Sequence, residues 1–143
     1  MTKPAGLSLT KQLDVRFSEV DAMQIVWHGS YALYFEDARE AFGAHYGLSY
    51  HTIADAGYYA PLVDLEFHYR RPIVYGNRPL ITITYVPTEA AKLIFDYVIT
   101  DETDGEVIAT GRSVQVFLDS NRNLMWTAPE FYEKWKAATL VQE

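Results

Sequence analysis

The sequence contains no cysteine, which excludes disulfides, thiolate metal sites and a cysteine nucleophile. Basic residues are few: 12 Lys and Arg stand against 19 Asp and Glu, which gives a net charge of −7. Because nucleic-acid binding needs a basic face that neutralises phosphates, this balance argues against a nucleic-acid partner. No apolar run approaches the roughly 20 residues of a membrane span, and the N-terminus lacks the apolar core of a signal peptide. We therefore expect a cytoplasmic protein with no membrane partner.

Aromatic residues, in contrast, are abundant: they make up 15% of the chain and include 11 tyrosines. Such rings favour large half-buried surfaces, such as a sheet face or a subunit interface. At 143 residues the chain is long enough to bury a core as one domain spanning residues 1–143. Within it, residues 1–9 predict a flexible lead-in, and Pro129 predicts a short C-terminal helix over residues 128–138.

The stretch VRFSEVDAMQIVWHGSYALYFEDAREAFGAHY, residues 15–46, predicts the end of a strand, an irregular connection and one long helix. We expect the strand to span Thr10–Phe17 and the helix to begin with Ser30 or Gly29 as its N-cap. Gly47 is the expected residue just beyond the helix. The apolar stripe of this helix recurs at helical spacing: Tyr31, Phe35, Ala38 and Phe42.

The rest of the chain predicts strands with a period of two, over residues 63–70, 80–86, 92–100 and 107–118. In the first of them, Val63 and Leu65 are expected on one face and Asp64 on the other. Asp104-Gly105 is a strong hairpin signal between the last two. One long helix with these strands predicts an α+β fold with an antiparallel five-stranded sheet. Since one helix leaves sheet surface and an edge uncovered, we expect a homodimer, or a homotetramer built from dimers.

The irregular connection brings a carboxylate close to a helix start. Asp21 could act as a nucleophile or as a general base, and a sheltered loop could raise its pKa enough for that work. The helix start near His28 offers unpaired N–H groups and a dipole suited to an oxyanion. A histidine at a helix N-terminus has its charged form disfavoured, so the backbone of His28 is preferred to its side chain. Taken alone, without the motif that follows it, Asp21 would be interpreted first as a loop-capping residue, since Asp favours turns.

A resemblance rests on these residues: Asp21-Ala22-Met23-Gln24-Ile25-Val26-Trp27-His28-Gly29-Ser30-Tyr31, continuing into Tyr34-Phe35-Glu36-Asp37-Ala38-Arg39, and later Tyr69-Arg70-Arg71-Pro72 with Tyr75-Gly76-Asn77. With the strand order, they resemble the 4-hydroxybenzoyl-CoA thioesterase family of hotdog-fold proteins over roughly residues 10–136. The resemblance implies a hotdog fold, in which the sheet wraps around one long central helix. Many members have glycine where this chain has Gln24, and glutamine adopts a positive φ only at a cost.

The resemblance also implies a function: hydrolysis of an acyl-CoA thioester in a site shared by two subunits, with no metal and no cofactor except the CoA of the substrate. Asp21 would be nucleophile or general base, and His28 would donate its backbone N–H to the oxyanion, a contact whose loss typically costs ~10²–10³ in rate. The expected acyl-binding residues are Gln24, Ile25, Val26, Trp27, Tyr31 and Asp64. The candidates for contacts with the CoA phosphates are Arg70, Arg71, Lys92 and Arg112.

Several alternatives stay open. A hotdog hydratase or dehydratase would use an Asp–His dyad, although Asp21 and His28 are spaced differently from the Asp…Asn-Pro…His pattern of those enzymes. A non-catalytic acyl-binding dimer is a third possibility, and the thioester could be carried by an acyl carrier protein. On the helix, Glu36 and Asp37 are expected to form ion pairs with Arg39 or Arg16 rather than to enter the site. The remaining histidines are scattered and predict no metal site: His45, His51 and His68.

Overall fold

The computed structural model describes residues 7–140. Its elements, in chain order, are β1 (Ser8–Gln12), 3₁₀ turns at Phe17–Glu19 and His28–Ser30, α1 (Tyr31–Tyr46), α2 (Tyr50–Asp55), β2 (Leu62–Tyr69), β3 (Leu80–Val86), β4 (Lys92–Thr100), β5 (Val107–Val116) and α3 (Glu130–Thr139). None of the described helices is long and apolar enough to cross a membrane.

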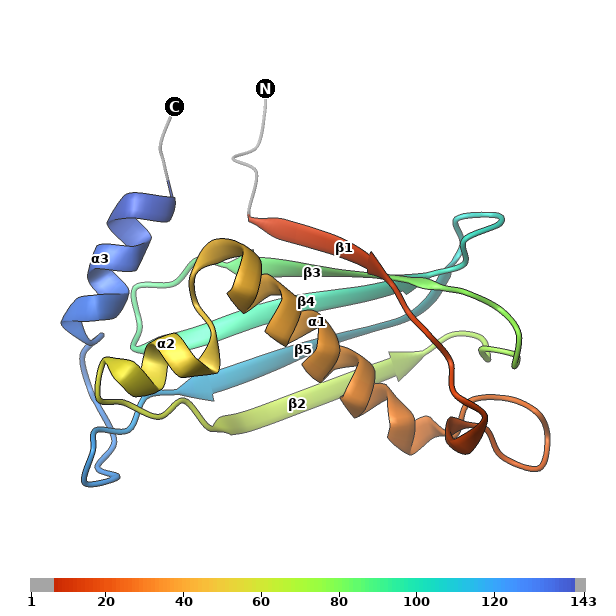
Figure 1. Cartoon of the computed structure of the whole chain (residues 1–143), viewed down its shortest axis with the longest axis horizontal. Coiled ribbons are helices and arrows are strands. Elements are labelled where there is room, and N and C mark those ends of the chain that lie inside the picture. Colours follow the sequence, from red (N-terminus) through yellow and green to blue (C-terminus); the bar gives the residue numbers. More distant parts are fainter. Residues whose placement is uncertain (1–6, 141–143) are drawn as a thin grey trace.

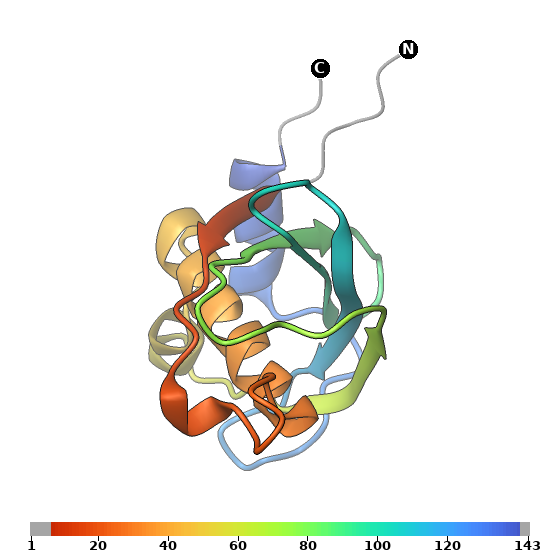
Figure 2. The same ribbon diagram turned by 90° about the vertical axis from the view of Figure 1, so that its right-hand side faces the viewer.

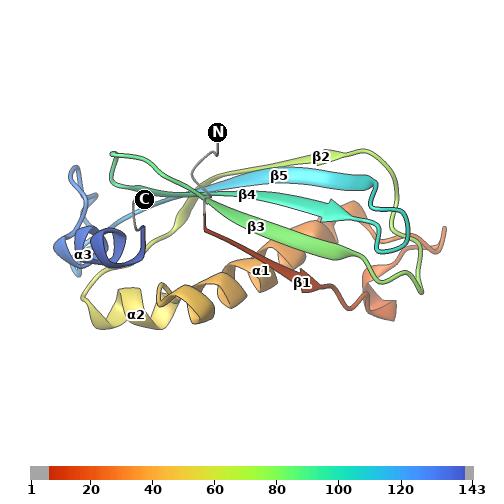
Figure 3. The same ribbon diagram turned by 90° about the horizontal axis from the view of Figure 1, so that it is seen from above.

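The strands form one sheet in the order β1-β3-β4-β5-β2, and each neighbouring pair is antiparallel. Helix α1 lies across one face of this sheet (Figure 1), and the sheet curves around it (Figure 2). Seen from above, the other face carries no helix along β3, β4 and β5 (Figure 3). The predicted α+β fold, an antiparallel sheet wrapped around one long helix, is therefore confirmed, and β1 and β2 form its two edges.

The core lies between α1 and the concave face of the sheet. Alternate residues of β3 and β4 are buried there, as the period of two predicts. Phe35 of α1 stacks on Tyr97 of β4 with ring centroids 4.1 Å apart. Beside it, a Cβ on Gly111 of β5 would collide with the Phe35 ring and with the carbonyl oxygen of Glu66. Glycine at this position therefore allows α1 to pack directly against the backbone of β5.

The first strand was predicted too far along the chain. Its pairing with β3 ends at Gln12, opposite Leu80, because the next residues leave the sheet. At Phe17–Glu19 the chain forms a 3₁₀ turn, in which the backbone N–H of Arg16 donates to Oε1 of Glu19 at 2.9 Å. Of the predicted lead-in, residues 1–6 lie outside the described residues and Ser8 already belongs to β1.

Both ends of the predicted helix are confirmed: α1 begins at Tyr31, with Ser30 in the N-cap position, and ends at Tyr46. A 3₁₀ turn over His28–Ser30 precedes it, so Ser30 has helical backbone angles, with φ −75°, and its side chain makes no capping bond. Its hydroxyl instead donates to the carbonyl oxygen of Glu19 at 3.3 Å. At the other end, Gly47 adopts φ 77° and donates its N–H to the carbonyl oxygen of Gly43, as expected of a glycine beyond a helix.

Strand β2 contains an irregularity that its alternating sequence did not reveal. The register with β5 shifts between Leu62 and Asp64, which leaves Val63 at a bulge with 59% of its surface exposed. Val63 and Leu65 were predicted to share one face of the strand. This prediction is wrong, because the bulge turns Val63 away from the face on which Leu65 lies. The exposed large apolar residues of this edge strand are Leu62, Val63 and Tyr69.

Candidate active site

The connection before α1 is a tight hairpin rather than an irregular loop. Val20 and Val26 form an antiparallel bridge, and inside it the N–H of Asp21 donates to the carbonyl oxygen of Ile25 at 2.9 Å. Gln24 closes the turn with φ 68°, and its N–H donates to the carbonyl oxygen of Asp21 at 2.9 Å. The left-handed conformation that suits glycine is thus adopted by a glutamine, at a cost of about 1 kcal/mol.

Neighbouring backbone holds this hairpin from the outside. The N–H of Val26 donates to the carbonyl oxygen of Ile73 at 2.9 Å, and that of Tyr75 donates to the carbonyl oxygen of Gln24 at 3.0 Å. These contacts join the hairpin to the segment that follows β2. They explain how Gln24 is kept in its strained conformation, since the surrounding structure determines the backbone on both sides.

Glu19 connects the hairpin to the start of the helix, a role that the sequence did not suggest. Its carbonyl oxygen accepts from the N–H of Trp27 at 2.8 Å, and its Oε1 accepts from the hydroxyl of Tyr34 at 2.8 Å. Burial, together with this bond to a carboxylate, raises the pKa of Tyr34. A glutamate three residues after the start of a turn was the available signal, but its contact with Tyr34 depends on the tertiary fold.

The hairpin, the start of the helix and the end of β2 enclose a groove of about 350 Å³. Its lining residues are Asp21, Met23, Ile25, Val26, His28, Tyr31, Tyr69, Arg70, Arg71 and Pro72. The structure thus brings together seven of the predicted site residues: Asp21, His28, Ile25, Val26, Tyr31, Arg70 and Arg71. The predicted site residues that do not line it are Gln24, Trp27, Asp64, Lys92 and Arg112.

Asp21 combines the two roles that the sequence left open. Its Oδ1 accepts the N–H of Met23 at 2.8 Å, so the carboxylate stabilises the turn. The same side chain lines the groove, and in the described part of the chain no donor is found for its second oxygen. One carboxylate oxygen therefore holds the loop, while the other is available to chemistry in the groove.

The start of the helical segment faces the same groove. In residues 7–140 no acceptor is found for the N–H groups of His28 and Gly29, as expected of the first groups of a helix. Trp27 packs over Gly29, where a Cβ would collide with the indole ring. The carbonyl oxygen of His28 accepts the hydroxyl of Tyr69 at 2.9 Å, which fixes this turn to β2.

Two tyrosines line the apolar part of the groove. Tyr31 and Tyr69 meet edge to face with ring centroids 4.8 Å apart. Burial, and secondarily Tyr69, raises the pKa of Tyr31 to about 12. Tyr31 is thus a neutral, apolar wall near pH 7 rather than an acid or base.

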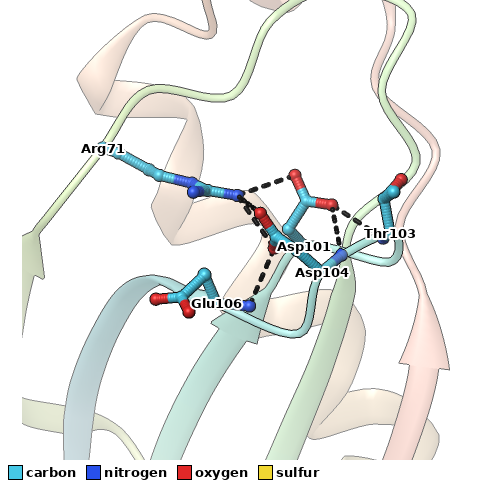
Figure 4. A network of polar contacts seen from close by, with 5 residues as sticks. All are labelled: Arg71, Asp101, Thr103, Asp104 and Glu106. Atoms are coloured by element: carbon cyan, nitrogen blue, oxygen red, sulfur yellow. Dashed lines mark hydrogen bonds and ion pairs between the residues drawn. The ribbon is translucent and has the colours of Figure 1, made fainter.

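The predicted basic residues divide into two groups. Arg70 and Arg71 line the groove, but Nη2 of Arg71 also contacts Asp101 at 2.9 Å and Asp104 at 3.1 Å in the β4–β5 hairpin (Figure 4). The hydrogen bond to Asp104 is the main reason why the pKa of Arg71 is raised. Arg112 is held by Asp96, with its Nε 2.6 Å from Oδ1.

Lys92 and Asp64 lie apart from the groove. Lys92 begins β4, whereas Asp101, the contact of Arg71, follows the end of that strand. Asp64 is exposed on the edge strand β2. No group of three or more His, Asp or Glu side chains that could hold a metal is found in residues 7–140.

A curved five-stranded antiparallel sheet around one long helix is the hotdog fold. In this protein a groove lies at the start of that helix. The profile of the "Thioesterase-like superfamily" matches residues 15–138, and the chain belongs to this family. A protein of Bacillus subtilis described as "Putative acyl-CoA thioesterase YneP" is 28% identical over 109 residues, which cover 76% of this chain and 78% of that protein.

Solved structures agree on the fold. The hypothetical protein TT1821 from Thermus thermophilus is 26% identical, with a TM-score of 0.80 over 91% of this chain and 98% of its own. Slr0204, a 1,4-dihydroxy-2-naphthoyl-CoA thioesterase from Synechocystis, is 20% identical, with a TM-score of 0.79 over 91% of this chain and 96% of its own. At that identity, Slr0204 supports the fold alone. The predicted resemblance to hotdog thioesterases is confirmed at the level of the family.

Proposed function

We propose that this protein hydrolyses an acyl-CoA thioester to a free carboxylate and CoA, with Asp21 at the reacting centre. One observation carries the proposal: a free carboxylate oxygen of Asp21 and the unpaired N–H groups at the helix start line or border one groove. Membership of the thioesterase-like superfamily and the similarity to YneP support the reaction class.

In the proposed mechanism the thioester carbonyl lies at the start of the helix, and its oxygen accepts the N–H of His28. As that oxygen becomes negative, the N–H group and the helix dipole stabilise it. Asp21 takes a proton from water while the water oxygen bonds to the carbonyl carbon. The tetrahedral intermediate then collapses, the C–S bond breaks, and the proton passes to the leaving sulfur.

A nucleophilic route is the second version of this mechanism. Asp21 would itself bond to the carbonyl carbon and expel the thiolate, which leaves a mixed anhydride for water to cleave. A single turnover in heavy-oxygen water tests for the nucleophilic route. Label in the Asp21 carboxylate would establish that route, because general-base catalysis places the water oxygen only in the product.

We also propose that the active form is a homodimer. The edge strand β2 exposes Leu62, Val63 and Tyr69, and an unpaired apolar edge favours pairing with a second chain. Tyr69 also lines the groove, so a partner seated on β2 would complete its open side. Light scattering across a dilution series tests this, and a tetramer would indicate a further contact through the helix-free face of the sheet.

The test of the function is thiol release from short, medium, long and aromatic acyl-CoAs by the wild type and by Asp21→Asn. Asparagine keeps an oxygen that can accept the N–H of Met23, so the turn is expected to persist. We expect the rate to fall by ~10²–10⁴. Asp55→Asn, on an exposed residue of α2, is the matched control and is expected to keep full activity.

Other outcomes point to other functions. Release that survives in Asp21→Asn would exclude Asp21 as the base or nucleophile. Addition of water to the acyl chain, or loss of water from it, without release of free thiol would indicate a hydratase or dehydratase, because only hydrolysis releases the thiol. If no acyl-CoA reacts, the same panel on an acyl carrier protein separates a carrier-dependent enzyme from a binding dimer.

A further inference from the structure

A second, smaller cavity of about 80 Å³ lies between α1 and the sheet, farther along α1 than the Asp21 groove. Its walls are largely apolar and include Phe35, Leu62 and Leu65. Its polar lining includes Arg39, Ser113 and Gln115, all buried, whereas Glu36 and Tyr50 are exposed. An apolar pocket with a few convergent polar groups is the usual form of a small-molecule subsite.

Arg39 is the residue that requires explanation, because the sequence predicted only an ion pair on the helix for it and the structure leaves it 2% exposed. Its Nε donates to Oε1 of Gln115 at 2.9 Å, and its Nη1 donates to the carbonyl oxygen of Leu48 at 3.0 Å. Nη2 is buried and has no hydrogen-bond partner in the described part of the chain. Such an unpaired donor is costly when it is removed from water.

The charge of Arg39 has no ion-pair partner within residues 7–140. No carboxylate approaches its guanidinium to ion-pair distance, and the ion pair predicted with Glu36 does not form. Glu36 lines the same cavity and interacts with Arg39 only at longer range, while it accepts the hydroxyl of Tyr50 at 3.5 Å. The rings of Tyr50 and Phe95 each lie 4.9 Å from Cζ of Arg39. A buried cation without an ion-pair partner is a site where an anion would be stabilised.

The cavity and the groove both lie along the seam between α1 and β2, although they share no lining residue. On α1, Tyr31 lines the groove and the next residue, Ala32, lines the cavity. On β2, Tyr69 lines the groove while Leu65 lines the cavity. Tyr31 and Arg39 are separated by about 12 Å along the helix axis. This separation is comparable to the length of a medium acyl chain, so one such chain could contact both the groove and the cavity.

We propose that the Arg39 cavity binds a terminal carboxylate of the acyl group, so that the preferred substrates are thioesters of medium-length dicarboxylic acids. This inference rests on the proposed thioesterase function. The volume is sufficient for a carboxylate, because one water molecule needs only about 10–15 Å³ of cavity volume and the cavity offers about 80 Å³. The carboxylate would accept the free Nη2 and neutralise the buried guanidinium in one contact.

The test compares suberoyl-CoA with octanoyl-CoA, which have equal chain lengths and differ only in the terminal carboxylate. We expect kcat/KM to be about tenfold to a hundredfold higher for suberoyl-CoA, as a charge-assisted hydrogen bond provides. ω-Hydroxyoctanoyl-CoA tests whether the terminal group must be charged, and its kcat/KM should not exceed that of octanoyl-CoA in the same way. Equal rates for all three, or an equal gain from the hydroxyl, would overturn the assignment of a carboxylate site.

Because Arg39 is buried and bonded on two sides, its replacement perturbs the fold, so the variants are placed at half-buried alanines of α1. Ala32→Leu should fill the cavity from α1, abolish the preference for suberoyl-CoA and leave octanoyl-CoA the better substrate. Ala41→Leu, on the same helix but outside the cavity lining, should retain the preference. A preference that survives Ala32→Leu would also overturn the assignment.

A binding measurement separates this inference from the proposed function. Free suberate should raise the midpoint temperature of unfolding of the wild type more than octanoate does, and this difference should disappear in Ala32→Leu. If no acyl-CoA is hydrolysed but suberate still stabilises the protein through this cavity, the carboxylate site stands and the thioesterase fails. If thioesters are hydrolysed and suberate has no effect beyond that of octanoate, the carboxylate site fails.

Discussion

The hydroxyl of Tyr69 donates a hydrogen bond to the carbonyl oxygen of His28 across 2.9 Å, which joins the edge strand β2 to the first turn of the helical segment. The neighbouring N–H of His28 is the group that we assign to the oxyanion. The position of that donor thus depends on a residue 41 places later in the chain.

We expect Tyr69→Phe to lower kcat about fivefold with a small change in KM, because it removes one hydrogen bond worth about 1 kcal/mol that orients the oxyanion donor. Steady-state kinetics with the best acyl-CoA measure this. The control is Tyr59→Phe, another half-exposed tyrosine, which lies outside the groove. Equal effects of the two variants would show that the contact between Tyr69 and His28 does not orient the donor.

Stability should fall in alkaline solution. Burial raises the pKa of seven tyrosines: Tyr31, Tyr34, Tyr50, Tyr69, Tyr85, Tyr97 and Tyr132. Above the ordinary value of 10.0 the unfolded chain releases these protons while the folded chain keeps them, so the free energy of unfolding decreases as pH rises.

For Tyr31 the window runs from 10.0 to about 12. Urea unfolding at several pH values in this range should show a shallower decrease for Tyr31→Phe than for the wild type. Tyr59→Phe, at an exposed tyrosine, should follow the wild type. A Tyr31→Phe curve with the wild-type slope would contradict the linkage.

Gly111→Ala is expected to destabilise the protein by about 1–3 kcal/mol, because the new methyl group collides with the Glu66 backbone and the Phe35 ring, neither of which can move freely. Thermal unfolding measures this loss. Gly29→Ala provides the comparison, since its Cβ collides with the Trp27 ring, which is 53% exposed and can swing away. A similar loss of stability in both variants would show that the Phe35 ring and the Glu66 backbone relax as easily as the exposed Trp27 ring.

Arg70→Ala should raise KM for acyl-CoA about twofold to fivefold at low salt, the range expected for a partly exposed charge contact with phosphate. The effect should shrink as ionic strength rises. Arg112→Ala is the comparison, because Asp96 already holds that guanidinium through two hydrogen bonds. An equal rise in KM for both variants would favour the prediction from the sequence that Arg112 contacts the CoA phosphates as Arg70 does.

The sequence predicts the elements that local patterns control. The period of α1 and the alternation in β3 and β4 correspond to their observed faces, because one side of each element is buried and the other is not. The end of the first strand was misplaced because contacts from distant residues decide where the chain leaves the sheet. Glu19, for example, accepts from Trp27 and Tyr34, and neither contact follows from its own neighbours.

The candidate site divides in the same way. Asp21 and His28 were placed together correctly because a short motif carries both. Tyr69 was not among the predicted site residues, although its hydroxyl donates to the carbonyl oxygen of His28. Arg39 was expected to form an ion pair on the helix, but Tyr50 and the carbonyl oxygen of Leu48, from a later part of the chain, enclose it.

The close contact between Phe35 and Gly111 also bears on how such proteins diverge. The backbone of β5 sets the separation between helix and sheet at this point, and no side chain at residue 111 can widen it without a collision. New acyl specificities are therefore expected to arise by substitutions at the two ends of the seam, such as Leu62 or Tyr69, rather than by a change in layer spacing. A duplicated copy of this gene could acquire a new substrate while its architecture stayed fixed.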